Sequence, residues 1–323
     1  MEIKICSTQE WSYCEWESFV SSFEAIFHKG FTKDYFNNKY LSVCDRQSYH
    51  ALLLHEDKVV GNISVIPYWY RHNEDELIKI GLAADVFILE DYRSDPFTLR
   101  RMYKRLTTLL IEKRIVSVMA VPNETAYSYW KNVVKWQDVG MIKYWGMPVR
   151  VGNIMRKSKL LNVCSLIYVY IAVSISFVLS ALCRSSQKKF QYEIVDDESF
   201  LQGRFSHDDY VQIHHRNCMN CFRIVDEQGV RTAYLIYSRQ KKRMSFLSLY
   251  KGVFSILKEH KVDLILYVGP LKLFQTLFLC IPQNFEPKSL PLTCDLLIKD
   301  DEIHKDMLDF DKWDFGLLNY DVR

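Results

Sequence analysis

The chain has 323 residues, of which 49% are hydrophobic and 25% are charged, and its formal net charge is +3. This balance is typical of a globular protein, excludes a disordered chain, and the length predicts two domains. The weak positive charge does not give the clustered basic surface of nucleic-acid-binding proteins, so we expect no nucleic-acid partner. Nine cysteines in apolar surroundings predict reduced thiols and a cytoplasmic location, and residues 1–4 lack the apolar core of a signal peptide.

The first half of the chain predicts two helices followed by a sheet. Hydrophobic residues at helical spacing predict a helix over about 16–28, and a second, short helix starts at Thr32. Short polar turns then join three strands into an antiparallel meander. The expected elements from there on are strands at 49–54, 59–70 and 77–89, an amphipathic helix at 99–114, a strand at 115–121, a helix at 124–134 and a strand at 136–149.

The loop from Glu90 to Thr98 is the best indication of function. It leaves a strand and opens a helix, where unpaired backbone N–H groups and the positive end of the helix dipole favour an anion. The sequence therefore predicts an enzyme that holds a phosphorylated cofactor.

The uncharged segment from Leu160 to Cys183 is about as long as a membrane span. Basic residues flank it on both sides, so charge gives no orientation across a membrane. Three interpretations remain open for this segment: a span, an in-plane or re-entrant membrane contact, and a helix buried between domains.

The second half partly repeats the order of the first. Strands at 221–225 and 230–237, a helix at 247–259, a strand at 262–268 and an apolar helix at 271–279 indicate a degenerate internal duplication. Only Gln240 to Arg243 offers a basic loop before its helix, so we interpret this half as structural or substrate-binding.

Several segments resemble the GNAT superfamily of acyl-CoA-dependent N-acyltransferases, and the layout resembles two-lobed members found beside bacterial surface-glycan pathways. The segment Val59 to Pro67 is similar to the family's second long strand, and Asp85 to Leu89 to the strand that pairs with pantetheine. Tyr92-Arg93 is similar to the start of the pyrophosphate loop. The residues Asn123, Ala126, Trp130 and Trp136 match the family spacing of Asn, Ala, Tyr and Phe after the fifth strand.

The resemblance implies an α+β fold of tandem GNAT-like lobes, each a mixed, mostly antiparallel sheet flanked by helices, joined by an apolar helical linker. The expected division is an acyl-CoA-binding lobe at 1–150, an apolar helical linker at 151–189 and a degenerate lobe at 190–323. Whether the linker associates with a membrane stays open at this point. The resemblance also implies transfer of an acetyl or other acyl group from acyl-CoA to an amine or hydroxyl. The preferred acceptor is an amino sugar or glycan precursor near the inner membrane surface. The alternative is an inactive GNAT-like scaffold that binds partners in such a pathway.

The residues expected to bind acyl-CoA lie on the pantetheine strand, in the loop and at the following helix starts. They are Val86, Phe87, Ile88, Arg93, Ser94, Thr98, Arg100, Arg101 and Asn123. Guanidinium groups suit phosphate, although a solvated helix face explains Arg100 and Arg101 equally, and Asn123 suits a helix N-cap. Pro96 and Thr98 occupy positions where the family loop has glycines, so the backbone donors there are altered.

The catalytic candidates are Asp85, Tyr127 and Tyr129. Asp85, an acid within an apolar strand, is a general base if burial raises its pKa, or a hydrogen-bonded structural carboxylate. Trp130 stands where many relatives have a tyrosine acid, so that role would pass to Tyr127 or Tyr129. The His214-His215 pair beside Cys218 and Cys221 gives only a weak zinc pattern, and we expect no metal.

Overall fold

The computed structural model describes residues 1–73, 76–156, 158–182, 190–206, 209–215, 218–227, 229–240, 245–271, 278–298 and 306–320. The chain forms two compact units, each made of separate stretches of sequence. The first unit comprises Met1–Met141, Gln191–Ser206 and Leu290–Trp313. The second comprises Ile142–Phe190, His207–Ser289 and Asp314–Arg323.

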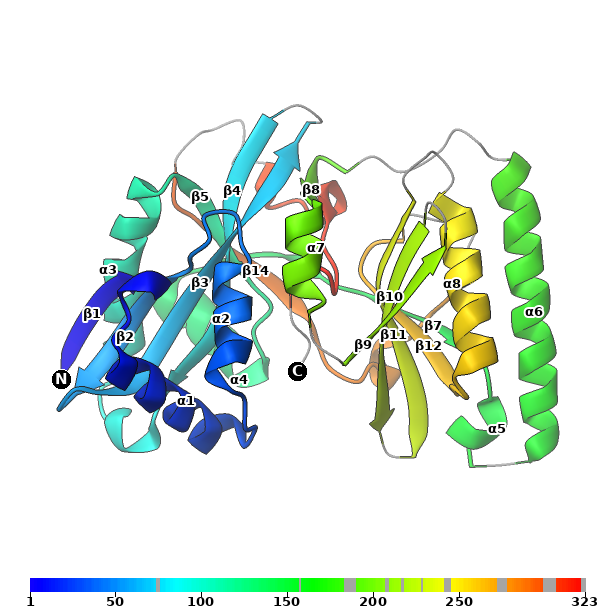
Figure 1. The fold of residues 1–323 in the computed structure, drawn as a ribbon, viewed down its shortest axis with the longest axis horizontal. Helices are drawn as coiled ribbons and strands as arrows, with labels where there is room; N and C mark the ends of the chain where they lie inside the picture. The colour runs from blue at the N-terminus through cyan, green and yellow to red at the C-terminus, as the bar shows by residue number, and fades with distance from the viewer. Residues whose placement is uncertain are drawn as a thin grey trace. The chain divides into compact units, whose positions relative to one another are not determined.

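A mixed sheet with the strand order β1-β2-β3-β4-β5-β14-β6 forms the centre of the first unit (Figure 1). The predicted meander β2-β3-β4 is antiparallel, β5 is parallel to β4, and β14 is antiparallel to both β5 and β6. β8 pairs with the far end of β3. The elements are β1 (Glu2–Ser7), α1 (Tyr13–Phe27), α2 (Lys33–Leu41), β2 (Tyr49–His55), β3 (Lys58–His72), β4 (Glu76–Ile88), α3 (Thr98–Glu112), β5 (Ile115–Ala120), α4 (Glu124–Tyr129), β6 (Gln137–Met141), β8 (Tyr192–Ile194), α7 (Glu198–Arg204), β14 (Pro291–Leu296) and β15 (Trp313–Asp314).

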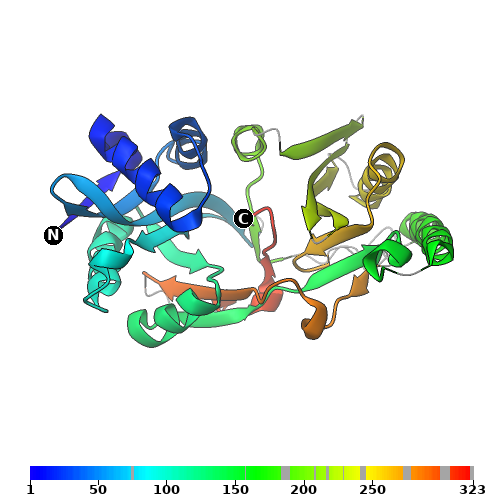
Figure 2. The ribbon, with the colours of Figure 1, turned by 90° about the horizontal axis from the view of Figure 1, so that it is seen from below.

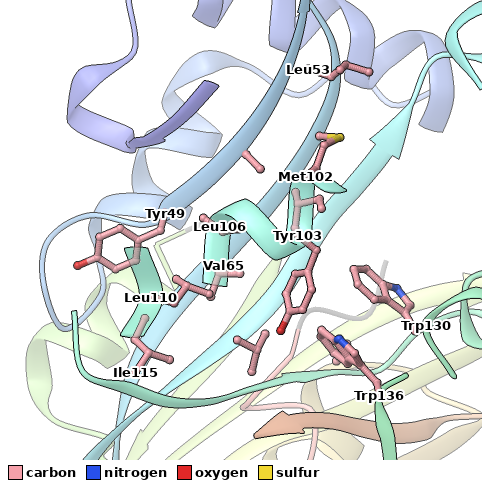
Figure 3. Close-up of a cluster of buried hydrophobic side chains, with 14 of the residues drawn as sticks. Tyr49, Leu53, Val65, Met102, Tyr103, Leu106, Leu110, Ile115, Trp130 and Trp136 are labelled. Carbon is pink, nitrogen blue, oxygen red and sulfur yellow. The ribbon is translucent and has the colours of Figure 1, made fainter. Parts of the chain in front are cut away.

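Helices cover both faces of this sheet, with α1 and α2 on one face and α3 on the other (Figure 2). The apolar stripe of α3, which includes Met102, Leu106 and Leu110, is buried against the sheet, as the amphipathic pattern predicts. Figure 3 shows that Tyr103 of α3 lies beside Trp130 and Trp136 in the same cluster. The side chains of this core therefore hold α3 on the sheet.

Aromatic side chains dominate the opposite face, between α1, α2 and the sheet. Phe19 lies with its ring centroid 4.9 Å from that of Phe36 and 5.9 Å from that of Phe87 on β4. Trp11 packs on Trp16 at 4.5 Å. Large aromatic rings bury much apolar surface for each residue, so this cluster anchors both helices on β3 and β4.

The second unit repeats the meander, helix and parallel strand of the first, in agreement with the predicted duplication. β9, β10 and β11 are antiparallel neighbours, and β12 pairs in parallel with β11 after α8. Its strand order is β13-β7-β12-β11-β10-β9. The elements are β7 (Tyr144–Pro148), α5 (Val151–Ile154), α6 (Lys159–Leu182), β9 (Tyr210–His215), β10 (Cys218–Glu227), β11 (Val230–Gln240), α8 (Ser245–Glu259), β12 (Leu264–Val268) and β13 (Leu279–Cys280).

The predicted single strand at 136–149 is wrong. It consists of β6, which pairs with β14, and β7, which pairs with β12 and β13 in the sheet of the second unit. Because both halves are extended and only Ile142 and Lys143 separate them, their sequence does not show that the chain leaves one sheet between Met141 and Tyr144.

The division at residues 150 and 190 also differs from the compact units. Gln191–Ser206 and Leu290–Trp313 belong to the first unit, where β14 lies between β5 and β6. Such a pairing between distant segments leaves no local pattern in the sequence. The expected helix at 271–279 lies mostly outside the described residues, and Leu279 is in strand β13.

The apolar segment forms α6, which belongs to the second unit and packs on α8 and β7. Val169 and Val173 of α6 are buried in the core of that unit with Met147 and Val253. In the part of the chain that is described, no helix has the length and hydropathy needed to span a membrane.

Candidate functional site

β4 and β5 pair over only part of their length. The paired residues run from Lys79 and Ile115 to Leu82 and Met119, and no described residue of β4 beyond Leu82 pairs with β5. β5 pairs on its other side with β14. The second half of β4 therefore lacks a strand partner on the side of β5, at the place where the sequence predicts acyl-CoA binding.

A bulge interrupts β4 at the point where it leaves β5. Between the pairs Asn62–Phe87 and Ser64–Ala84, β4 has two residues where β3 has one. Asp85, in this bulge, has a φ of +49°, a left-handed conformation that Asp adopts more readily than most residues with a side chain. Bulges of this kind redirect a strand, and they are frequent beside active sites.

The backbone of Ile88 faces the side of β4 that lacks a strand partner. The N–H of Leu89 donates to the Val60 carbonyl of β3 at 2.8 Å, and successive peptide groups of a strand point to alternate edges. The N–H and carbonyl of Ile88 therefore point away from β3. The Nε of Arg93 donates to that carbonyl oxygen at 2.7 Å. The loop and the strand edge thus meet at Ile88, while the side chains of Val86 and Ile88 pack on the α3 core.

The Asp85 side chain points to the opposite face of the sheet, where α2 holds it. Lys39 forms an ion pair with the carboxylate at 2.8 Å, and Tyr40 Oη donates to Oδ2 at 2.7 Å. The exposed fraction of the Asp85 side chain is only 5%. Asn62 Nδ2 also donates to the Asp85 carbonyl oxygen at 2.7 Å, so both the side chain and the backbone of the bulge are fixed.

A buried chain of polar groups continues from Asp85 toward β1. Tyr40 Oη accepts a hydrogen bond from Ser64 Oγ at 3.1 Å, and His50 Nδ1 lies 3.0 Å from the same Ser64 oxygen. His50 Nε2 lies 2.7 Å from Thr8 Oγ1. Burial lowers the pKa of His50 to about 3, although the Asp85 charge opposes this shift. His50 is therefore a neutral link in this chain near pH 7.

The sequence did not point to this polar chain, because its members lie on α2, β2, β3 and β4 and, at Thr8, in the turn after β1. Each polar residue on its own resembles an ordinary strand or helix residue. The available signal was the run of polar residues at inward positions of strands, since buried polar groups need partners.

The loop before α3 carries its own anion. The Asp95 carboxylate accepts hydrogen bonds from the Phe97 N–H at 2.8 Å and from Arg101 Nη2 at 2.5 Å. The hydrogen bond from the Phe97 N–H has the larger effect, and both bonds lower the pKa of Asp95, so its carboxyl group is charged at neutral pH. The Thr98 N–H donates to the Asp95 carbonyl at 3.2 Å. The loop thus satisfies some of the backbone donors that we expected to hold phosphate.

The other candidates in this region have different surroundings. Arg93, Ser94 and Arg100 are exposed, whereas Thr98 is buried and its Oγ1 accepts a hydrogen bond from Arg101 at 3.2 Å. The two arginines thus have different contacts: Arg93 binds the Ile88 carbonyl at the start of the loop, and Arg101 binds Asp95 and Thr98 at its end.

Tyr129 ties α4 to the start of α3. Its Oη donates to the Pro96 carbonyl at 2.6 Å and accepts from the Arg100 N–H at 3.3 Å. Tyr127 lies elsewhere on α4, and its Oη donates to Asp138 Oδ1 of β6 at 2.8 Å. Lys131 pairs with the same carboxylate. Tyr129 thus contacts the loop before α3, whereas Tyr127 contacts β6.

Asn123 caps α4, as the sequence predicts: its Oδ1 accepts from the Ala126 N–H at 2.8 Å. The helix continues as a π-helical turn (Trp130–Val134). Trp130 is buried with its ring centroid 4.5 Å from that of Trp136 (Figure 3), so it has a core position.

Across the described ranges, no group of three or more His, Cys, Asp or Glu side chains is placed to hold a metal ion. In the weak zinc pattern, His214 pairs in register with Met219, and Cys221 is buried opposite Gln212.

No protein-family model and no curated protein match the sequence. Solved structures do match its fold. A probable N-acyltransferase from Enterococcus faecalis gives a TM-score of 0.58 at 10% identity, covering 92% of this chain and 73% of that one. A GCN5-related N-acetyltransferase from Anabaena variabilis gives 0.56 at 12% identity, covering 91% and 73%.

N-myristoyltransferase from Saccharomyces cerevisiae with bound myristoyl-CoA gives a TM-score of 0.53 at 11% identity, covering 92% of this chain and 83% of that one. At such low identity the likeness concerns the fold. Two sheets flanked by helices, each with a parallel strand after an antiparallel meander, give this chain the α+β, GNAT-like fold that the sequence predicts.

Proposed function

We propose that the chain is an acyl-CoA-dependent acyltransferase whose first unit binds the thioester along the second half of β4. The observation that carries this proposal is the loss of pairing between β4 and β5 beyond Leu82, beside the bulge at Asp85. The solved structures of similar fold include N-acyltransferases, and one of them binds myristoyl-CoA. Fold alone does not carry activity, so the proposal depends on the strand edge.

The strand edge suits a pantetheine arm because both are extended chains of amide groups. Such a chain can add to a strand that lacks a partner through backbone hydrogen bonds. In this proposal the backbone of Ile88 and Val86 holds the arm, whereas the expected contact at Phe87 is not made by its backbone, because the N–H and carbonyl of Phe87 point toward β3. A backbone N–H pointing at the thioester oxygen also stabilises the negative charge that develops during acyl transfer.

The phosphates would lie at the loop between β4 and α3. Arg93 and Arg100 offer exposed guanidinium groups there, and Arg101, Ser94 and Thr98 offer further donors. Arginine pairs with phosphate through two parallel hydrogen bonds, which offsets the loss of the glycine backbone donors at Pro96 and Thr98. Asn123 contributes indirectly, since it caps α4, whose Tyr129 holds the loop.

Proton transfer is assigned among the three catalytic candidates by their contacts. Asp85 positions the bulge, because Lys39 and Tyr40 already engage its carboxylate. The Tyr129 hydroxyl donates to Pro96, so it orders the loop. Tyr127 is the remaining candidate for proton donor to the leaving thiolate, and in that role its hydroxyl has to exchange its hydrogen bond to Asp138 for one to the sulfur.

The proposed acceptor is the amine or hydroxyl of an amino sugar or glycan precursor on the cytoplasmic side of the inner membrane. Its support is the resemblance of the sequence to two-lobed members of surface-glycan pathways. Free thiols in the described part of the chain, which suit a reducing compartment where acyl-CoA is available, are Cys6, Cys14, Cys44, Cys164, Cys221, Cys280 and Cys294.

Calorimetric titration of the full chain with acetyl-CoA tests the proposal. We expect saturable binding, and release of free CoA thiol when a glucosamine-type acceptor is added. An Arg93→Ala variant should bind about 10- to 100-fold more weakly, as expected for a lost charged hydrogen-bond donor. Arg105→Ala, which removes an exposed arginine farther along α3, is the matched control. Absence of binding heat at millimolar acetyl-CoA would overturn the enzyme proposal.

One observation favours the alternative, an inactive GNAT-like scaffold that acts as a binding protein in the same pathway. At the start of α3 the Asp95 carboxylate already accepts a hydrogen bond from the Phe97 N–H, and the Tyr129 hydroxyl already accepts one from the Arg100 N–H. A chain whose phosphate loop is satisfied by its own side chains would not bind CoA. The same titration separates the two functions.

A further inference from the structure

The outer side of α6 is an apolar stripe that no described part of the chain covers. Its large side chains recur every three or four residues and keep exposed fractions between 45% and 69%. At 1.5 Å for each residue the stripe is about 27 Å long. It consists of Leu160, Val163, Ile167, Ile171, Ile175 and Val178.

The orientation of α6 is fixed by the contacts of its inner side. Ser165 Oγ donates to the Val149 carbonyl at 2.8 Å and accepts from the Val151 N–H at 3.1 Å. Val169 and Val173 are buried in the core of the second unit. Figures 1 and 2 both show α6 beside α8 with its other long side turned away from the sheet. The stripe is therefore a stable surface of the folded unit.

The segment that contains α6 carries charges of one sign, although Arg150 at its start forms an ion pair with Asp263 at 3.7 Å. Residues 150–189 contain no Asp or Glu, although the whole chain has 39 acidic residues in 323. The same stretch contains cations before and after the uncharged segment: Arg150, Arg156, Lys157, Lys159, Arg184, Lys188 and Lys189. An apolar helix face with basic residues at both ends suits a surface that is apolar inside and anionic outside.

We propose that the α6 stripe docks the protein in the plane of an anionic phospholipid bilayer. The isoleucines would enter the boundary between headgroups and acyl chains, as other in-plane amphipathic helices do, while Lys159 at the start of α6 meets a lipid phosphate and the basic sequence around the helix adds to the attraction. This inference does not depend on acyl transfer. If both hold, the membrane contact brings the transferase to acceptors at that surface.

Charge favours a bilayer over a second copy of the chain as the occupant. A symmetric dimer through this stripe would pack the same basic segment against itself, because a twofold interface uses one patch twice. With no acidic residue between 150 and 189, the opposed cations would repel each other. A bilayer containing phosphatidylglycerol has the opposite charge.

Flotation of the full chain with vesicles tests the inference. We expect binding to phosphatidylcholine vesicles that contain phosphatidylglycerol, weaker binding to phosphatidylcholine alone, and a decrease at high salt. Replacing Ile167, Ile171 and Ile175 together by Gln should weaken binding on the order of 100-fold. Replacing Lys188 and Lys189 by Gln should weaken it about 25-fold, near 1 kcal/mol for each charge.

A matched control replaces exposed apolar residues of the first unit, Leu77→Gln with Ile111→Gln. This control should float like wild type, and all variants should keep their helical circular dichroism. Two results would overturn the inference: a wild-type protein that does not bind anionic vesicles, or a control variant that loses vesicle binding as strongly as the triple variant does. Dimeric wild type that becomes monomeric in the triple variant, without vesicle binding, would assign the stripe to a second copy instead.

Discussion

Asp95 and Arg101 form an ion pair of 2.5 Å at the start of α3, where the sequence predicts phosphate binding. The pair neutralises one of the cations expected to hold CoA and places a carboxylate among the backbone donors. Binding of a phosphorylated cofactor must therefore either displace Asp95 or proceed beside its charge. In the proposed function, the affinity of this loop for CoA would therefore depend on this acid as much as on the arginines.

Asp95→Asn should tighten CoA binding about 10-fold, because it removes a like charge near the phosphates and releases Arg101. The amide still accepts the Phe97 N–H, so the loop conformation is kept. Calorimetric titration with CoA measures the change. Asp91→Asn, in the same loop but before Arg93, is the control and should leave the affinity unchanged. Weaker binding by Asp95→Asn would show that the carboxylate supports the site rather than opposing the ligand.

Asp85→Asn should mainly lower stability. Removing one partner of a buried ion pair leaves Lys39 without its counter-charge, at a cost of about 3 kcal/mol. Asn tolerates the left-handed φ of this position, so the bulge itself can form. We expect a lower melting temperature, a modest loss of kcat/KM and an unchanged pH profile of the reaction.

A general base at Asp85 would behave differently. The variant would then lose kcat by about 1000-fold and lose the acidic limb of the pH profile. Tyr40→Phe is the companion variant, since it removes one hydrogen bond to the carboxylate and keeps the charge pair with Lys39. It should lower stability less than Asp85→Asn does.

The parts of the fold set by local pattern could be predicted from the sequence. The meander, α3 and the repeated layout of the second unit follow from alternation and helical spacing in contiguous segments. The insertion of β14 between β5 and β6 could not be predicted, because it pairs residues about 175 positions apart, and no local pattern in the sequence records a pairing over that separation. The switch between β6 and β7 was missed because only two residues, Ile142 and Lys143, separate these two extended segments.

The structural elements around the candidate site could be predicted, but the contacts of its side chains could not. The spacing around Arg93 and Asn123 located the loop and the helix cap correctly. The roles of Asp85 and Tyr129 depend on partners from other elements, Lys39 and Pro96, and on a backbone angle that the sequence does not specify. Asp95 carried a usable signal, since Asp before Pro often bonds the backbone two residues on.

Tyr129→Phe should raise KM for acyl-CoA several-fold and leave kcat within about 2-fold. The variant loses the hydrogen bonds to Pro96 and Arg100, about 1 kcal/mol each, and the loop at the start of α3 loosens. Steady-state kinetics over a range of acetyl-CoA concentrations separates KM from kcat. Tyr127→Phe is the paired variant and should lower kcat without raising KM. The opposite pattern would make Tyr129 the proton donor.

His50 should make the protein less stable as the pH falls below 6.5. In the unfolded chain His50 binds a proton near pH 6.5, whereas burial lowers its pKa to about 3 in the folded protein. Between these values the unfolded state binds more protons, so the free energy of unfolding decreases by about 1.4 kcal/mol for each pH unit lost. Above pH 6.5 both states are neutral and this contribution is constant.

Urea unfolding at pH values from 5 to 7 isolates this effect, because most carboxylates stay charged in that window. His50→Gln can keep hydrogen bonds to Ser64 and Thr8 but does not titrate, so its stability should vary much less with pH. His28→Gln, which removes an exposed histidine at the end of α1, should keep the wild-type slope. If His50→Gln and wild type lose stability in parallel, then His50 is protonated in the folded protein. The polar chain from Thr8 to Asp85 would then carry a positive charge beside the bulge, and the Asp85 carboxylate would have a second counter-charge besides Lys39.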